Sequence, residues 1–188
     1  MSDFEKSVLS ACAPTLFGAK QATLFSCPLK NAADFACFRM IYGDFMKEKD
    51  IYFKPLYMCK NRLFIMAYRR EGMRSYLSQK SVSAFLLKEG YPDLLKGNVE
   101  KMLNHLTVRI KLSRSFPHEI GFFLGYPTED VFGFIKHKGD NYKLCGYWKV
   151  YGSEETARDM FSKISESRKM IQHFISSEAS IKTLFDAA

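Results

Sequence analysis

The sequence predicts an α/β protein, with α+β as the alternative, in which a mixed sheet of about five strands is flanked by helices. Three observations favour this class. Strand-like and helix-like segments alternate towards both ends of the chain, a hairpin-like pair of apolar segments lies between them, and several segments carry apolar residues at helical spacing. The hairpin argues against a purely parallel sheet.

The N-terminal part of the chain predicts a helix, a strand and a second helix. Residues 3–12 carry apolar side chains on one helical side, and the run ATLFS at residues 22–26 has the composition of a strand. Pro28 suits the start of a helix because its missing N–H needs no partner there. Residues 31–50 then repeat aromatic and aliphatic side chains at helical spacing.

Residues 51–59 and 62–70 predict the central hairpin. Lys60-Asn61 forms a two-residue connection between two strand-like runs that carry apolar residues on both faces. Pro55 cannot donate a hydrogen bond to a neighbouring strand. Its strand should therefore lie at an edge of the sheet or contain a bulge.

The second half of the chain predicts helices interrupted by two strands. Residues 73–89 favour one or two helices, and a helix from residue 93 is indicated by apolar residues at i, i+3, i+4, i+7 and i+11. The run HEIGFFLGY at residues 118–126 and the run at residues 142–151 are expected as strands. Two helices should follow, with Thr128 and Ser153 as their N-terminal caps.

Composition and length favour one soluble globular domain over residues 1–188, located in the cytoplasm. The chain is 188 residues long with a net charge of +8, and no run reaches the ~18 apolar residues of a membrane-spanning helix. The five cysteines contain no CxxC pair, so we expect reduced thiols and predict no metal site. Residues 51–116 hold thirteen basic and four acidic residues, which concentrates the positive charge in the middle of the chain.

Three runs together resemble a known family: CAPTLFGAK at residues 12–20, FPHEIGFFLGYPTEDVFGFIKHKG at residues 116–139 and YKLCGYWKVYG at residues 142–152. The family is a bacterial one catalogued only as a domain of unknown function. The resemblance spans nearly the whole chain and implies a bacterial cytosolic protein. It implies no activity, cofactor or catalytic residue, so the cofactor stays unknown.

One hypothesis is a thiol enzyme with Cys27 as nucleophile and His118 as its base. Cys27 follows a predicted strand and precedes a predicted helix start, where the helix dipole can lower a thiol pKa. His118 opens a later strand and could accept the thiol proton if the fold brought the two together. A buried structural cysteine is the plainer interpretation, and the sequence leans against an enzyme. A cofactor or metal carrier is a further alternative.

The leading hypothesis is a binding or accessory protein that contacts an anionic ligand or a partner protein through its basic middle segment. Lys101, His105 and Arg109 fall at i, i+4 and i+8 on one face of a predicted helix, where they could bind an anion. Nucleic acid is a possible partner, but no sequence motif of a nucleic-acid-binding fold supports it. An ordinary solvated helix face is the plainer interpretation of this pattern.

A ligand cleft is the last candidate site. Glu119, Phe123 and Tyr126 of the run at 118–126, with Cys145 and Tyr147 of the next predicted strand, are its candidate residues. Gly121 and Gly125 on the Glu119 side of the predicted strand leave room for a ligand or for a closely packed helix.

Overall fold

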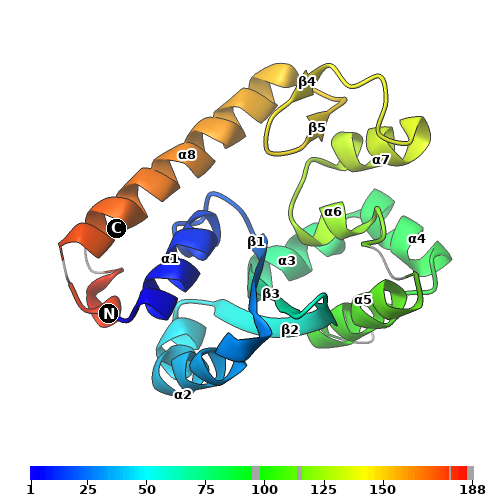
Figure 1. Ribbon diagram of the computed structural model, residues 1–188. Coiled ribbons are helices and arrows are strands. Elements are labelled where there is room, and N and C mark those ends of the chain that lie inside the picture. The colour runs from blue at the N-terminus through cyan, green and yellow to red at the C-terminus, as the bar shows by residue number, and fades with distance from the viewer. Residues whose placement is uncertain (95–97, 114–115, 178, 186–188) are drawn as a thin grey trace. The chain divides into compact units, whose positions relative to one another are not determined.

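The computed structural model describes residues 1–94, 98–113, 116–177 and 179–185 (Figure 1). The chain forms two compact units: Met1–Arg69 with Lys163–Ala188, and Arg70–Ser162. The mixed helix and strand content confirms the predicted α/β class. The prediction of a single domain over residues 1–188 stays a prediction.

The first unit combines an antiparallel sheet with helices. Its elements, in chain order, are α1 (Asp3–Leu16), β1 (Ala22–Pro28), η1 (Leu29–Asn31), α2 (Ala32–Glu48), β2 (Ile51–Cys59), β3 (Arg62–Arg69), the second part of α8 (Glu154–Ser176) and η2 (Ile181–Thr183). The sheet has the strand order β1-β3-β2. Ser2 and Glu5 form a capping box at the start of α1, in which each side chain accepts from the other residue's backbone N–H.

The predicted central hairpin is confirmed as β2 and β3. Lys60 and Asn61 both have positive φ, at 46° and 59°, as a two-residue turn with right-handed strand twist requires. β2 lies at an edge of the sheet, and its register with β3 shifts between Pro55 and Tyr57. Both expectations for Pro55 are therefore met: an edge strand and an irregularity.

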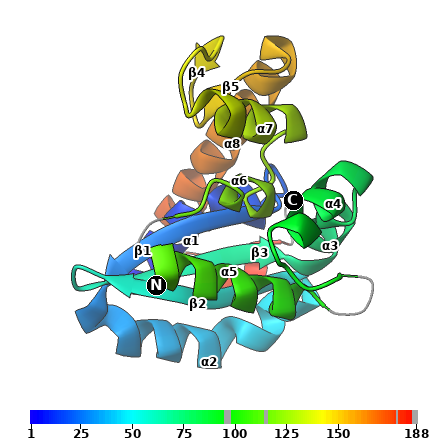
Figure 2. The ribbon, with the colours of Figure 1, turned by 90° about the vertical axis from the view of Figure 1, so that its right-hand side faces the viewer.

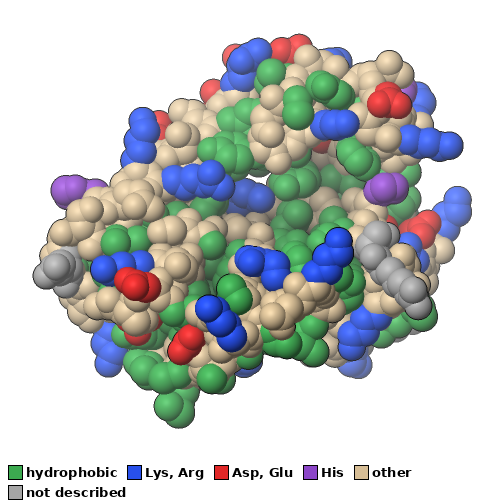
Figure 3. All heavy atoms as spheres, viewed as in Figure 1, with side chains coloured by type: hydrophobic (Ala, Val, Ile, Leu, Met, Phe, Trp, Pro, Cys, Tyr) green, Lys and Arg blue, Asp and Glu red, His purple; other side chains and the backbone are tan. Residues whose placement is uncertain are grey.

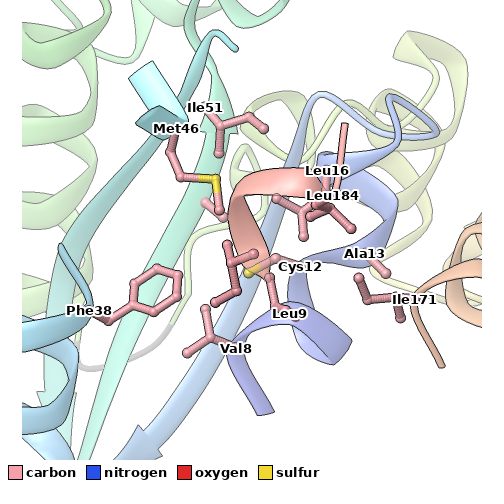
Figure 4. Close-up of a cluster of buried hydrophobic side chains, with 12 residues drawn as sticks. Val8, Leu9, Cys12, Ala13, Leu16, Phe38, Met46, Ile51, Ile171 and Leu184 are labelled. Carbon is pink, nitrogen blue, oxygen red and sulfur yellow. The ribbon is translucent and has the colours of Figure 1, made fainter. Parts of the chain in front are cut away.

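The hydrophobic core of the first unit lies between its helices and one face of the sheet. Val8, Leu9 and Cys12 of α1 face Phe38 of α2 and Met46 near its end (Figure 4). Ile51 of β2 and Ile171 of α8 belong to the same cluster, whose members are at most 3% exposed. α2 runs along the sheet (Figure 2). The helical spacing seen in residues 31–50 thus corresponds to a real helix with one buried face.

The second unit contains α3 (Arg70–Leu77), α4 (Lys80–Lys88), α5 (Val99–Ser113), α6 (Ile120–Phe123), α7 (Thr128–His137), β4 (Leu144–Cys145), β5 (Lys149–Val150) and the start of α8. The apolar stripe predicted for α5 is confirmed, because its members are all buried: Val99, Met102, Leu103, Leu106 and Ile110. Ser153 caps α8 as predicted, accepting from the Thr156 N–H at 3.2 Å.

The predicted strand over residues 118–126 is wrong, because this segment forms α6 and its flanking turns. Short-range backbone bonds take the place of strand pairing: the N–H of Gly121 donates to His118, and that of Tyr126 donates to Gly121. Gly125 has a φ of 74°, which glycine adopts without strain and which ends the helix. Since residues no longer alternate between two faces, the predicted sharing of faces along this run is also lost.

Two further predictions need correction. Residues 142–151 form a small hairpin of β4 and β5 rather than one strand, so the strands of the described residues lie in two separate antiparallel sheets. Thr128 is the first residue of α7 and not its cap: its hydroxyl lies 3.2 Å from that of Tyr76. The two acids in the first turn of α7 are in place.

In the described parts of the chain, every helix is too short or too polar to cross a lipid bilayer.

Candidate functional site

A pocket of about 360 Å³ lies in the second unit, and six of its twelve lining residues have aromatic rings. We call it the aromatic pocket. It is formed by the segment before α6, by α6 and the turn after it, by α7 and by the β4–β5 hairpin. Its lining residues are Phe116, Pro117, His118, Ile120, Gly121, Tyr126, Asp130, Val131, Phe134, Tyr147, Trp148 and Lys149.

Asp130 fastens the hairpin to α7. Its carboxylate, 3% exposed, accepts from the Trp148 indole N–H at 2.7 Å and from the backbone N–H groups of Tyr151 and Gly152 at 2.7 and 2.8 Å. Hydrogen bonds to a charged acceptor are the strong ones in proteins. Asp130 also lies in the first turn of α7, where the helix dipole interacts favourably with a negative charge.

Stacked rings set the position of Trp148 in the pocket wall. The Tyr126 ring stacks on the indole with centroids 4.8 Å apart and planes 24° apart, and the Phe161 ring meets it edge-on at 4.6 Å. Tyr147 also contacts Phe161, at 5.4 Å. A Cβ on Gly146 would collide with the Phe161 ring, so this turn approaches α8 as only glycine allows.

Tyr126 is held from its backbone side. The Tyr76 hydroxyl of α3 donates a short hydrogen bond to the Tyr126 carbonyl. Gly121 faces the Tyr126 ring and α7: a Cβ at this position would lie 2.8 Å from a methyl group of Val131 and 3.3 Å from the tyrosine ring. The close packing that glycine was expected to permit is therefore present, although on a helix.

Phe134 lies near two nitrogen-bearing side chains of the pocket, those of His118 and Lys149. The His118 ring packs edge-on against it, with centroids 5.2 Å apart. A Phe134 ring atom and the Lys149 Nζ lie 3.3 and 3.5 Å from the position that a Cβ on Gly139 would take. Lys149 donates to the Gly139 carbonyl at 2.7 Å and lies over the Tyr142 ring, 4.9 Å from its centroid. The pocket therefore has a cationic end.

The structure brings together only some of the predicted ligand residues. Tyr126 and Tyr147 line the aromatic pocket, together with His118 from the thiol-enzyme hypothesis. Cys145 is exposed on β4 and is not a lining residue, while Glu119 and Phe123 are buried in a different cluster. Sequence reasoning missed Trp148, Phe134 and Lys149. Trp148 carried a signal, since it is the chain's single tryptophan.

Glu119 belongs to a buried polar cluster with Arg109 of α5. An Oε1 atom of Glu119 lies 2.5 Å from the Arg109 Nε and accepts from the Tyr91 hydroxyl at 3.2 Å. The Nε–H bond of Arg109 is not aligned with that oxygen, so the contact is an ion pair rather than a well-formed hydrogen bond. Arg109 also donates to the carboxylate of Glu89 at 3.0 Å and to its carbonyl at 3.1 Å.

This cluster changes how the predicted anion-binding face is interpreted. Arg109 is already paired with two carboxylates, and His105 packs on the Tyr91 ring with centroids 4.4 Å apart. Lys101 is exposed on the same helix. In Figure 3, Lys and Arg side chains are spread over the visible face rather than gathered in one patch. Arg109 thus has a structural role that the helical spacing did not reveal.

His105 gives the cluster a pH dependence. Burial and the nearby Arg109 charge lower the pKa of His105, and Glu119 opposes them with a smaller effect. Because the folded-state pKa lies below the unfolded value of about 6.5, the contribution of His105 to stability is present above that pH and decreases as the pH falls.

We therefore expect the urea midpoint to decrease as the pH is lowered from neutral to mildly acidic values. The variant His105→Phe should weaken this pH dependence while it keeps a ring against Tyr91. NMR titration of the His105 imidazole measures the pKa directly. A pKa at or above the value of free histidine would contradict the expectation.

Cys27 and Cys12 are buried thiols of the first unit. Burial raises the pKa of Cys27, and the Arg62 charge offsets this only in part. Burial also raises the pKa of Cys12. A thiolate nucleophile needs a lowered pKa, so this feature counts against the Cys27 hypothesis. Cys27 lies in the first unit and His118 in the second, and their pairing stays a prediction.

Potential metal ligands are dispersed along the described residues, where no three His, Cys, Asp or Glu side chains form a group able to hold an ion.

Fold and site together define an α/β protein with a ligand-sized aromatic pocket. The chain belongs to the family described as "Protein of unknown function (DUF3793)", whose model matches residues 8–185. The resemblance noted in the sequence is thereby confirmed. No curated protein and no solved structure matches the chain.

Proposed function

We propose that this protein binds a small, planar, largely apolar organic molecule in the aromatic pocket. The observation that carries the proposal is the wall made by Trp148 and Tyr126: the Trp148 indole N–H donates to Asp130, and the Tyr126 ring stacks on that indole. A side chain held in this way loses little freedom when a ligand binds, and so more of the contact energy contributes to affinity.

Size and chemistry support the same proposal. The volume of about 360 Å³ lies in the range of small-molecule sites, which are mostly apolar with a few polar groups that orient the ligand. Tyr126, Tyr147 and Trp148 present ring faces and edges to the space. Flat aromatic ligands pack well against such walls.

This proposal keeps the binding-protein hypothesis and moves its site. On the basic face of α5, Arg109 is already paired with Glu89 and Glu119, whereas the aromatic pocket offers a concave space. The raised pKa of Cys27 gives the thiol-enzyme alternative no support. A carrier of an organic cofactor would be a special case of the proposed binding.

Trp148 makes the proposal directly testable, since it is the only tryptophan and lines the pocket. Titration with the neutral dye phenylnaphthylamine should quench Trp148 emission in a saturable way, with energy transfer to the bound dye. The variant Tyr147→Ala should weaken binding about fivefold, because it removes one aromatic contact.

Tyr142→Ala is the matched control. Tyr142 is 44% exposed and Tyr147 38%, and both lie near the β4–β5 hairpin, but only Tyr147 lines the pocket. The control should bind the neutral dye like the wild type. The proposal would be abandoned if the dye left Trp148 emission unchanged, or if both variants weakened binding equally.

A further inference from the structure

Resting on the proposed function, we infer that the ligand of the aromatic pocket is an aromatic acid, whose anionic group binds at the Lys149 end while its ring lies against Trp148 and Tyr126. Two properties of the pocket support this inference: where its charges lie, and which of them are already used by the protein.

The cationic end is built around Phe134. The Lys149 Nζ and atoms of the Phe134 ring both lie within 3.5 Å of the position that a Cβ on Gly139 would take. His118 packs against the same ring. Lys149, Phe134 and His118 all line the pocket. The Gly139 carbonyl uses one N–H of the Lys149 ammonium and holds it in place. An ammonium has three donors, so a ligand oxygen can be bound by another.

Lys149 is also partly withdrawn from water. It is half-buried, and its amine lies over the Tyr142 ring. An ion pair formed in such surroundings is screened less than one on an open surface. A charged oxygen of the ligand would therefore gain more here than at an exposed lysine.

The acidic residue of the lining does not offer a matching site for a cation. The oxygens of Asp130 already accept three N–H donors, from Trp148, Tyr151 and Gly152. A cationic ligand would compete with these donors and would also meet the Lys149 charge. An anionic ligand does not compete with the donors to Asp130 and is attracted by Lys149. We therefore infer that the ligand charge is negative.

A pair of dyes with the same ring system tests the sign. Anilinonaphthalene sulfonate carries an anionic group that phenylnaphthylamine lacks. Energy transfer from Trp148 reports the binding of either dye. For each protein we compare the ratio of the two dissociation constants. The variant Lys149→Met should shift this ratio against the sulfonate about tenfold, as expected for loss of a hydrogen bond between charged groups.

Lys143→Met is the control variant. Lys143 flanks the same hairpin and donates to a backbone carbonyl, that of Gly152 at 2.9 Å, but it does not line the pocket. It has the same charge change as Lys149→Met and should leave the ratio unchanged.

The outcomes separate this inference from the proposed function. A shift in the ratio for Lys149→Met alone supports the inference. If the neutral dye binds and the ratio is the same in all three proteins, the acid-specific inference is wrong while the pocket proposal stands. If neither dye transfers energy from Trp148, both are overturned. Thermal unfolding of each variant shows whether the fold is retained, and the ratio does not depend on the fraction folded.

Discussion

Replacing Asp130 by alanine is expected to destabilise the second unit by about 3–5 kcal/mol, because it leaves the buried Trp148 N–H and two half-buried backbone N–H groups without their acceptor. Asp130→Asn should cost less, since one oxygen remains for the two backbone donors. Its amide nitrogen would then face the Trp148 indole N–H, donor against donor. Urea unfolding followed by Trp148 fluorescence measures both effects.

The neighbouring carboxylate provides the control for Asp130. Glu129 is in the same first turn of α7 but is exposed, so Glu129→Ala should cost less than about 1 kcal/mol through the helix dipole alone. In a double-mutant cycle, Trp148→Phe should reduce the further cost of Asp130→Asn, with unfolding followed by circular dichroism. Equal losses for Asp130→Ala and Glu129→Ala would show that the hairpin does not depend on this carboxylate.

Removing the Arg109 charge is expected to cost about 2–3 kcal/mol, because Glu119 would stay buried without a counter-charge. Glu119 has a side chain only 5% exposed, whereas that of Arg109 is 30% exposed, which places the expected loss at or below the lower end of the range for a broken buried pair. The variant Arg109→Met keeps most of the side-chain volume. Denaturant unfolding measures the change.

The second partner and a surface pair test whether burial is the cause. Arg109→Met combined with Glu119→Gln should lose less stability than the sum of the single changes, since the double variant leaves no buried charge unpaired. Arg158→Met breaks the exposed pair with Glu154, whose atoms lie 3.3 Å apart, and should cost no more than about 0.5 kcal/mol. A loss for Arg109→Met no larger than for Arg158→Met would refute the importance of the buried pair.

Local signals made much of the fold predictable. The hairpin of β2 and β3 follows from turn residues that accept positive φ and from a proline that suits only an edge or a bulge. The helix α5 follows from five apolar positions with a single period. In each case the residues that determine the structure lie close together in the sequence.

The segment around α6 shows where such reasoning ends. IGFFL is a short apolar run without a clear period, and a run of this kind suits a buried helix turn as well as a strand. Its conformation depends on contacts with residues further along the chain, for example the packing of Val131 against Gly121. Tertiary contacts also decide the role of Arg109, since its partners Glu89 and Glu119 lie outside α5.

The aromatic pocket could be predicted only in part. Tyr126 and Tyr147 line the pocket, but the strand on which the sequence places Tyr126 is absent, so their position in the wall does not follow from that pattern. Phe134 and Lys149 meet because α7 and the small hairpin fold onto each other. No spacing within either segment encodes that meeting.

The path of the chain through its two units has a consequence for synthesis on the ribosome. The first unit is discontinuous, and Ile171, Ile181 and Leu184 of its core come after the whole of Arg70–Ser162. Translation proceeds from the N-terminus. The core of the nascent first unit therefore stays incomplete while the second unit emerges and can fold. During this time Val8 and Leu9 lack these partners. The order of synthesis thus makes the first unit the last to close its core.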